Sequence, residues 1–141
     1  MAEPALHILL VEDDDVAAEG VVRSLARAGC PFPVVWAEDG CVALAALRDE
    51  DPLRHVPRPR VILLDLNMPR MNGFEFLAQL RTDPRLSDDV VFVLTTSDAQ
   101  GDRERAYQGH VAGYVLKAAA GPQYARLAQM LLRYAEAVRL P

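Results

Sequence analysis

The chain has little cysteine. Its 141 residues include two, Cys30 and Cys41, which form no CxxC pair and have no histidine at metal-ligand spacing. Two cysteines cannot build a disulfide-rich scaffold, and their surroundings give no sign of a cysteine-based zinc site. We expect two free, buried thiols in a reducing compartment.

Positive charge and long apolar runs are also scarce. The chain has 15 Lys and Arg against 20 Asp and Glu, a formal net charge of −5. A nucleic-acid binder of this size usually shows a basic face, so we expect no nucleic-acid partner. The longest stretch without a charge, 106–116, is far shorter than the roughly 20 residues of a membrane helix. The N-terminus has no basic signal-peptide region, and we expect a cytoplasmic protein with no membrane partner.

Internal repeats and low-complexity segments are absent, and what remains is ordinary globular composition. Apolar residues make up 51% of the chain and charged residues 25%. A chain of this length suits one domain. We therefore expect a single domain over 1–141, with no output domain.

Apolar runs and helical patterns alternate along the chain. Five short apolar runs predict buried strands at 8–11, 34–36, 61–64, 90–94 and 113–116. Helical spacing follows each of them, at 16–28, 41–47, 74–80, 101–109 and 123–140. Alternating strands and helices favour a doubly wound α/β fold with a five-stranded parallel sheet. The flavodoxin-like strand order 2-1-3-4-5 is the arrangement we expect.

Acidic residues follow two of the predicted strands directly. Glu12 and Asp13 follow the first strand, and Asp65 follows the third. The strand order places these two strand ends side by side, at the edge where ligands bind in open α/β sheets. Two carboxylates 4 Å apart repel by about 4 kcal/mol at an effective dielectric of 20, and a hard cation such as Mg²⁺ relieves that repulsion. Asp14 and Asp15 are better explained as N-cap residues of the first helix.

Four segments, each at the end of a predicted strand, carry a family resemblance. They are VEDD at 11–14, DLNMP at 65–69 with Gly73, LTTS at 94–97, and GYVLK at 113–117. In this order they resemble the receiver domains of two-component response regulators, a (βα)5 fold. The LLDLNMPR and LTTS segments look like one branch in particular, the stand-alone regulators paired with phytochrome-type sensor kinases.

The resemblance implies a phosphoacceptor site. Asp65 would accept a phosphoryl group from a phosphohistidine of a sensor histidine kinase. Asp13, Asp65 and the main-chain carbonyl of Asn67 would hold Mg²⁺ as the cofactor, with Glu12 reaching it directly or through water. Beyond its own phosphorylation and dephosphorylation, the chain would not be an enzyme.

Three further residues take roles through the same resemblance. Lys117 would pair with Asp65 and later with the phosphoryl oxygens. Thr95 would donate its hydroxyl to a phosphoryl oxygen, and Thr95 and Tyr114 would form the conformational switch. A half-buried strand aromatic is the alternative reading of Tyr114, and both can hold. Trp36 and the three histidines have no partner evident from the sequence, and we interpret them as structural or exposed.

One position departs from the family pattern. Lys117 is followed by Ala118, where family members usually carry a proline after a cis bond. A cis bond without proline costs about 3–4 kcal/mol. Either the bond is trans with a rearranged loop, or the site holds a strained cis bond; the penalty favours trans.

The last predicted helix has apolar residues on more than one side. They are Tyr124, Leu127, Met130, Leu131, Leu132, Tyr134 and Val138. One domain buries one stripe of a helix, so the surplus predicts a partner surface. In the branch that the chain resembles, homodimers often form through the fourth helix, the fifth strand and the fifth helix.

Two other functions are weighed against the phosphoacceptor. A Mg²⁺-dependent phosphohydrolase with an aspartyl-phosphate intermediate commonly has a second acid two residues after the nucleophile. That position is Asn67 here, which cannot exchange a proton. A pseudo-receiver that binds partners without phosphorylation is disfavoured by the complete set of acids, although the missing proline keeps it open.

Overall fold

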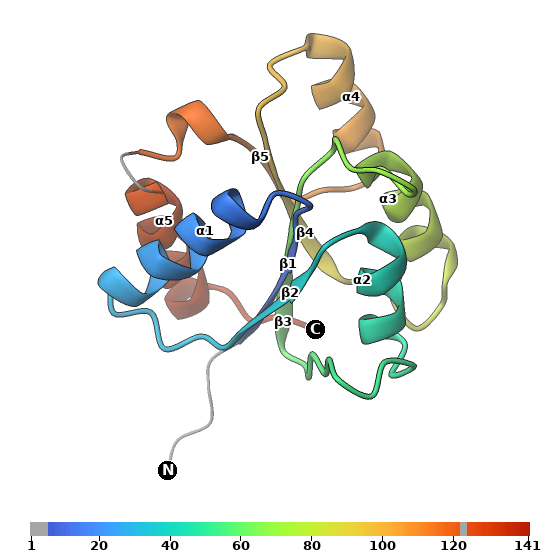
Figure 1. The fold of residues 1–141 in the computed structure, drawn as a ribbon, viewed down its shortest axis with the longest axis horizontal. Helices are drawn as coiled ribbons and strands as arrows, with labels where there is room; N and C mark the ends of the chain where they lie inside the picture. The colour runs from blue at the N-terminus through green and yellow to red at the C-terminus, as the bar shows by residue number, and fades with distance from the viewer. Residues whose placement is uncertain (1–5, 122–123) are drawn as a thin grey trace.

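Five strands alternate with helices in the computed structural model, which describes residues 6–121 and 124–141 (Figure 1). The strands are β1 (His7–Val11), β2 (Val34–Ala37), β3 (Arg60–Leu64), β4 (Val90–Thr95) and β5 (Gly113–Leu116). The helices are α1 (Asp15–Arg27), α2 (Gly40–Leu47), α3 (Gly73–Thr82), α4 (Gln100–Gln108) and α5 (Ala125–Ala137), with a 3-10 turn η1 (Lys117–Ala119) before α5. All strand pairs are parallel and the order is β2-β1-β3-β4-β5. The predicted fold class and strand order are confirmed.

Side chains of successive strand residues point to opposite faces of the sheet. Leu9 and Ile62, paired across β1 and β3, belong to the core beneath α2, α3 and α4. Their neighbours Leu10 and Leu63 belong to a second core beneath α1 and α5. Every residue of β3 is buried, which explains why the central strands are continuous apolar runs rather than alternating patterns.

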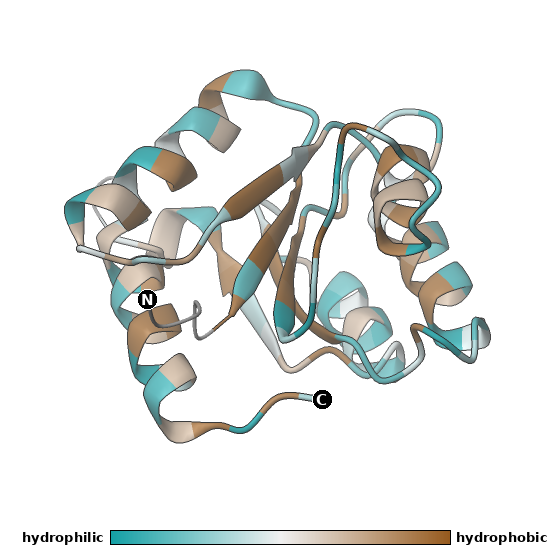
Figure 2. Cartoon of the chain, turned by 90° about the horizontal axis from the view of Figure 1, so that it is seen from below, coloured by the Kyte–Doolittle hydropathy of each residue, from teal (hydrophilic) through white to brown (hydrophobic). Residues whose placement is uncertain are grey.

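The helical layers follow from this two-sided burial. Figure 1 shows α1 and α5 on one side of the sheet, and α2, α3 and α4 on the other. The strands carry most of the strongly apolar residues, and the helices alternate between polar and apolar stretches (Figure 2). None of the helices in the described part of the chain is long and apolar enough to cross a membrane.

The last helix is shorter than its sequence pattern predicts. It ends at Ala137, and the backbone at Val138 is extended (φ −111°, ψ 140°). Val138 therefore does not continue the stripe of Leu127 and Leu131, because the chain leaves the helix and Leu140 packs against the core. The predicted start at residue 123 lies outside the described residues.

The surplus of apolar residues on α5 is used largely within the chain. Met130, Leu132 and Tyr134 are half-buried against the core shared with α1. The Tyr134 ring meets Phe92 of β4 edge-on, with 5.2 Å between centroids. Because α5 contacts both α1 and the sheet, it buries more than one stripe. The premise of the partner-surface prediction is therefore weaker than the sequence indicates.

The cysteines are free, but they are not both buried as predicted. Cys30 is half-buried, and Cys41 is exposed near the start of α2. The sheet-facing stripe of α2 is formed by Ala43, Leu44 and Leu47, which leaves Cys41 on the solvent side.

Candidate functional site

Residues from four strand ends meet at the carboxyl edge of the sheet. Glu12 follows β1, Asp65 follows β3, Thr95 ends β4 and Lys117 follows β5. The last residues of β1 and β3 are paired with each other, and the Asp65 N–H donates to the carbonyl of Val11 at 3.0 Å. The ladder itself therefore places the acids of β1 beside Asp65.

Three carboxylates form a compact acidic cluster here. One oxygen each of Glu12, Asp13 and Asp65 lies within 4.8 Å of the others. Glu12 and Asp65 are buried, and Asp13 is exposed. The pKa of Glu12 is raised to about 7, mainly by burial and further by the nearby charge of Asp65, against the opposing effect of Lys117. The cluster is thus electrostatically strained when nothing binds to it.

The cationic partner of this cluster contacts Glu12 more closely than Asp65. The Nζ of Lys117 lies 2.8 Å from Glu12 Oε2 and 3.9 Å from Asp65 Oδ2. Burial lowers the pKa of Lys117, but its hydrogen bond with Glu12 and the two negative charges outweigh burial and raise the pKa overall. Lys117 thus pairs with Asp65, as expected, but Glu12 is the closer of its two partners.

The alanine after Lys117 does not displace the lysine from the site. Within residues 6–121 and 124–141, Arg58–Pro59 is the one cis peptide bond, so Lys117–Ala118 is trans, as the energetic penalty predicts. The chain instead turns through η1, in which the Ala120 N–H donates to the Lys117 carbonyl at 3.3 Å.

The loop after β3 is packed tightly around Asp65. The Asn67 N–H lies 3.4 Å from Asp65 Oδ1, and the Gly73 N–H donates to the Leu66 carbonyl at 3.0 Å. A Cβ on Gly73 would lie 2.6 Å from the Asp65 carbonyl oxygen and 2.7 Å from Leu66 Cα. Both are backbone atoms, so only a residue without a side chain fits at position 73.

Replacing Gly73 by alanine is expected to lower the free energy of unfolding by about 2–3 kcal/mol, as for an overpacked core. The added methyl group would push the loop that carries Asp65 and Asn67. Gly101→Ala in α4 is the matched control, since nothing lies within 4 Å of its Cβ and alanine favours helix. Chemical denaturation compares the two. Equal stability of both variants would contradict the close approach at Gly73.

The two predicted switch residues both contact Ser97. Thr95 is fully buried, and its hydroxyl oxygen accepts from the Ser97 N–H at 3.3 Å. The hydroxyl of the half-buried Tyr114 donates to the Ser97 carbonyl at 2.9 Å. The Ser97 hydroxyl in turn donates to Asp102 in α4 at 2.6 Å. Ser97 lies in the LTTS segment, but its sequence position indicates no role, because only the folded loop shows that it joins β4, β5 and α4.

Two residues near the β2–α2 junction make contacts that the sequence analysis did not predict. The indole N–H of Trp36 donates to the Glu12 carbonyl at 2.7 Å, so Trp36 does have a partner. The buried Asp39 caps α2 through the Val42 N–H at 2.9 Å and also pairs with Arg70 of the loop after β3. The sequence feature that could have predicted the Trp36 contact is its position near the end of β2. This position points to Glu12 only when β2 is known to lie beside β1.

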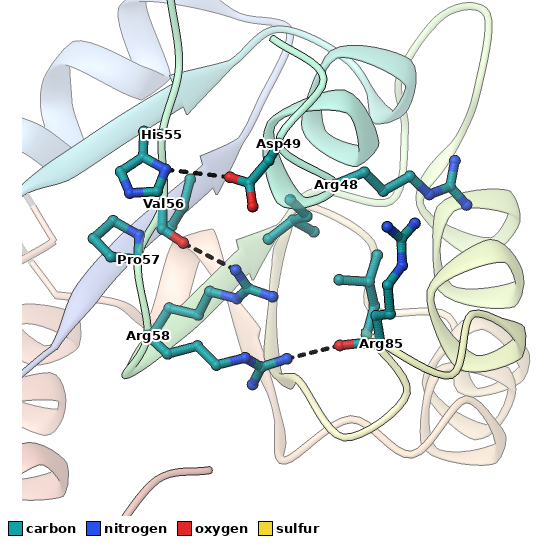
Figure 3. A pocket seen from close by; sticks show the side chains of 10 residues that line it. Arg48, Asp49, His55, Val56, Pro57, Arg58 and Arg85 are labelled. Atoms are coloured by element: carbon teal, nitrogen blue, oxygen red, sulfur yellow. Dashed lines mark hydrogen bonds and ion pairs between the residues drawn. The ribbon is translucent and has the colours of Figure 1, made fainter. Parts of the chain in front are cut away.

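A separate cavity lies at the opposite edge of the sheet and does not belong to this site. It has a volume of about 330 Å³ and is lined by Arg48, Arg58, Arg60 and Arg85, among others (Figure 3). Each of these guanidinium groups lies within 4 Å of a carboxylate, from Asp83, Asp88 or Asp89. Figure 3 shows Arg58 reaching the backbone carbonyl of Arg85, at 2.9 Å. These paired arginines join the loops before β3 and β4.

The donor atoms at the carboxyl edge suit a hard divalent cation. Carboxylate oxygens are the ligands that Mg²⁺ prefers in proteins. Three of them converge here from Glu12, Asp13 and Asp65, with one lysine nearby to offset their charge. The residues present therefore fit a magnesium-type ion.

Fold, acidic cluster and sequence together identify the class of protein. Residues 8–129 match the response regulator receiver domain family. The chain belongs to this family, whose members act in two-component systems.

Individual relatives show which members of the family the chain resembles. The chain is 41% identical over 117 residues to the probable methanogenesis regulatory protein FilR2 of Methanothrix harundinacea, covering 82% of this chain and 74% of FilR2. It is 36% identical over 116 residues to the response regulator Rcp1 of Synechocystis sp., covering 82% and 79%. The solved structure of the phosphorylated cyanobacterial phytochrome response regulator RcpA matches with a TM-score of 0.84 at 35% identity, covering 96% of this chain and 98% of RcpA. The Mn²⁺-bound form of Rcp1 matches with a TM-score of 0.83 at 34% identity, covering 96% and 99%.

Proposed function

We propose that this chain accepts a phosphoryl group on Asp65 from a phosphohistidine of a sensor histidine kinase. The observation that carries the proposal is the convergence of Asp65 with Glu12, Asp13 and Lys117 at one sheet edge. A carboxylate of Asp65 attacks phosphorus, an O–P bond forms, and the P–N bond to the histidine breaks with its electron pair returning to the imidazole. Phosphoryl transfer needs mainly positioning and neutralisation of charge, which this group of residues supplies.

The cation in this proposal is Mg²⁺, held by Glu12, Asp13, Asp65 and the main-chain carbonyl of Asn67. When bound, it offsets the negative charge of the acids and of the incoming phosphoryl oxygens. The Mn²⁺-bound form of the relative Rcp1 supports a divalent cation in this fold. Lys117, 3.9 Å from Asp65 Oδ2, provides the second positive charge. Its hydrogen bond with Glu12 keeps it charged and ready to shift toward the phosphoryl group.

The signal leaves the site through Thr95 and Tyr114 in this proposal. Both contact Ser97 at the start of the β4–α4 loop. A Thr95 hydroxyl that turns to a phosphoryl oxygen gives up the Ser97 N–H, so the loop and the tyrosine are free to repack. The face formed by α4, β5 and α5 is the proposed homodimer surface, supported by the half-exposed Tyr107 on α4 and by the half-buried residues of β5.

A phytochrome-type sensor kinase is the proposed phosphoryl donor. The similarity to RcpA, described as a cyanobacterial phytochrome response regulator, covers nearly the whole of both chains and supports this choice.

Phosphorylation from a small donor tests the proposal. The chain is incubated with acetyl phosphate and Mg²⁺, and intact mass spectrometry is expected to show one phosphoryl adduct that disappears with EDTA. Asp65→Asn is expected to carry no adduct, while Asp49→Asn, at an exposed aspartate away from the site, keeps it. A folded chain that binds Mg²⁺ but gains no adduct would favour the pseudo-receiver instead. An adduct that persists in Asp65→Asn would reject Asp65 as the acceptor.

A further inference from the structure

Both backbone polar groups of Glu12 are bonded to strand β2. Its N–H donates to the Ala37 carbonyl at 3.0 Å, as the last rung of the β1–β2 ladder. Its carbonyl accepts from the indole N–H of Trp36 at 2.7 Å. The second bond is made where the ladder has ended, so a side chain takes the place of a backbone donor.

The carbonyl that Trp36 holds belongs to the peptide group between two acids of the cluster. The Glu12 carbonyl and the Asp13 N–H lie in one planar unit. A donor that fixes this carbonyl therefore fixes the plane from which both side chains leave. Of the cluster, Asp13 is the exposed member, and within the described part of the chain its carboxylate accepts no hydrogen bond that would hold it.

Trp36 is itself held in place, although its side chain is partly in solvent. It is the single tryptophan of the chain and is 39% exposed. Its carbonyl accepts from Arg54 Nε at 3.0 Å, and Arg54 also pairs with Glu38 at 3.2 Å and Asp51 at 3.0 Å. Because the indole is partly exposed, it buries only part of its apolar surface. What Trp36 provides here that another apolar residue would not is the N–H donor to the Glu12 carbonyl.

We propose that Trp36 is a positioning residue for the divalent-cation site, acting through the Glu12–Asp13 peptide group. The inference rests on the proposed function, because that function supplies the cation. Trp36 touches neither the cation nor the phosphoryl group. It holds two of the acids in the arrangement that binds the ion, so that binding does not have to order the turn.

Calorimetric titration of Mg²⁺ into Trp36→Phe tests the proposal. Phenylalanine keeps an aromatic ring and removes the N–H. The loss of one hydrogen bond is expected to weaken Mg²⁺ binding by about three- to tenfold. Tyr134→Phe is the matched control: it removes a polar hydrogen from another partly buried aromatic, which packs against Phe92 within the chain, and is expected to bind Mg²⁺ as the unmodified chain does.

Fluorescence of the unmodified chain provides a second measurement, needed if Trp36→Phe fails to fold. Trp36 is the sole tryptophan, and its indole is bonded to the peptide group between two of the acids. The charge of a bound Mg²⁺ is therefore expected to change its emission, with the midpoint seen by calorimetry.

The outcomes separate the two proposals. Weaker Mg²⁺ binding by Trp36→Phe, with a matching fluorescence change, supports the positioning role. The positioning role is overturned if a folded Trp36→Phe binds Mg²⁺ as tightly as the unmodified chain, or if the emission of Trp36 does not change at saturating Mg²⁺. Neither result contradicts the phosphoacceptor function. A folded, unmodified chain that binds no Mg²⁺ overturns the cation site itself, and the role of Trp36 with it.

Discussion

Replacing Asp89 by alanine is expected to lower the free energy of unfolding by about 3–5 kcal/mol, the usual result of breaking a buried ion pair. Arg60 and Asp89 are both buried and form a bidentate pair, with Nε–Oδ1 at 2.8 Å and Nη2–Oδ2 at 2.9 Å. Without the carboxylate, the guanidinium of Arg60 keeps one partner, the Val56 carbonyl at 2.9 Å. The buried positive charge of Arg60, left with two unsatisfied N–H donors, accounts for the large loss in the free energy of unfolding.

Asp88→Ala is the matched control, because it removes the same group one residue earlier. Asp88 is exposed and lies 3.6 Å from Arg58, so its removal is expected to change stability by less than about 1 kcal/mol. Urea denaturation of both variants measures the difference. Similar midpoints for the two variants would show that the Arg60–Asp89 pair contributes little. Because this pair lies at the edge opposite to Asp65, the folded fraction of Asp89→Ala is expected to keep its phosphorylation by acetyl phosphate.

The fold was largely predictable because local pattern and global topology agree. Val61–Leu64 reads as a strand buried on both faces, and β3 is buried throughout. Helix ends followed local chemistry: Asp14 caps α1 by accepting from the Val16 N–H at 2.9 Å. The end of α5 was not predictable in this way, since Val138–Leu140 continues the apolar spacing and only the position of the core shows where Leu140 packs.

The residues of the site were predictable because the strand order fixes which strand ends meet. Glu12 and Asp65 are far apart in the chain, but the β1–β3 ladder brings them together. The partners within the site depend on side-chain reach, which spacing does not contain. Lys117 was expected to pair with Asp65, yet the longer side chain of Glu12 meets it first. Likewise, Ser97 acquires its contacts only when the β4–α4 loop has folded over Tyr114.

We expect the acidic cluster to bind a cation at the expense of stability, and Asp13→Asn to separate the two effects. Asp13 lies within 4.8 Å of two carboxylates, and in its exposed position each like-charge pair costs about 1 kcal/mol. Without metal, the variant is therefore expected to gain about 1–2 kcal/mol in the free energy of unfolding. Its Mg²⁺ affinity is expected to fall at least tenfold, since even groups that only orient metal ligands typically contribute 10–100-fold.

Asp15→Asn makes the same change of charge two residues later and is expected to act in the opposite direction on stability. Asp15 is exposed in the first turn of α1, where its charge is favourable by about 0.3–1 kcal/mol. Denaturation in EDTA and Mg²⁺ calorimetry on both variants measure the two quantities. If Asp13→Asn lost stability in EDTA, or bound Mg²⁺ as tightly as the unmodified chain, Asp13 would not be part of a strained cation site. Asp13→Asn is expected to gain stability and to lose Mg²⁺ affinity. A cap residue or an ordinary surface acid does not give this pair of results, because removing its charge relieves no repulsion between carboxylates.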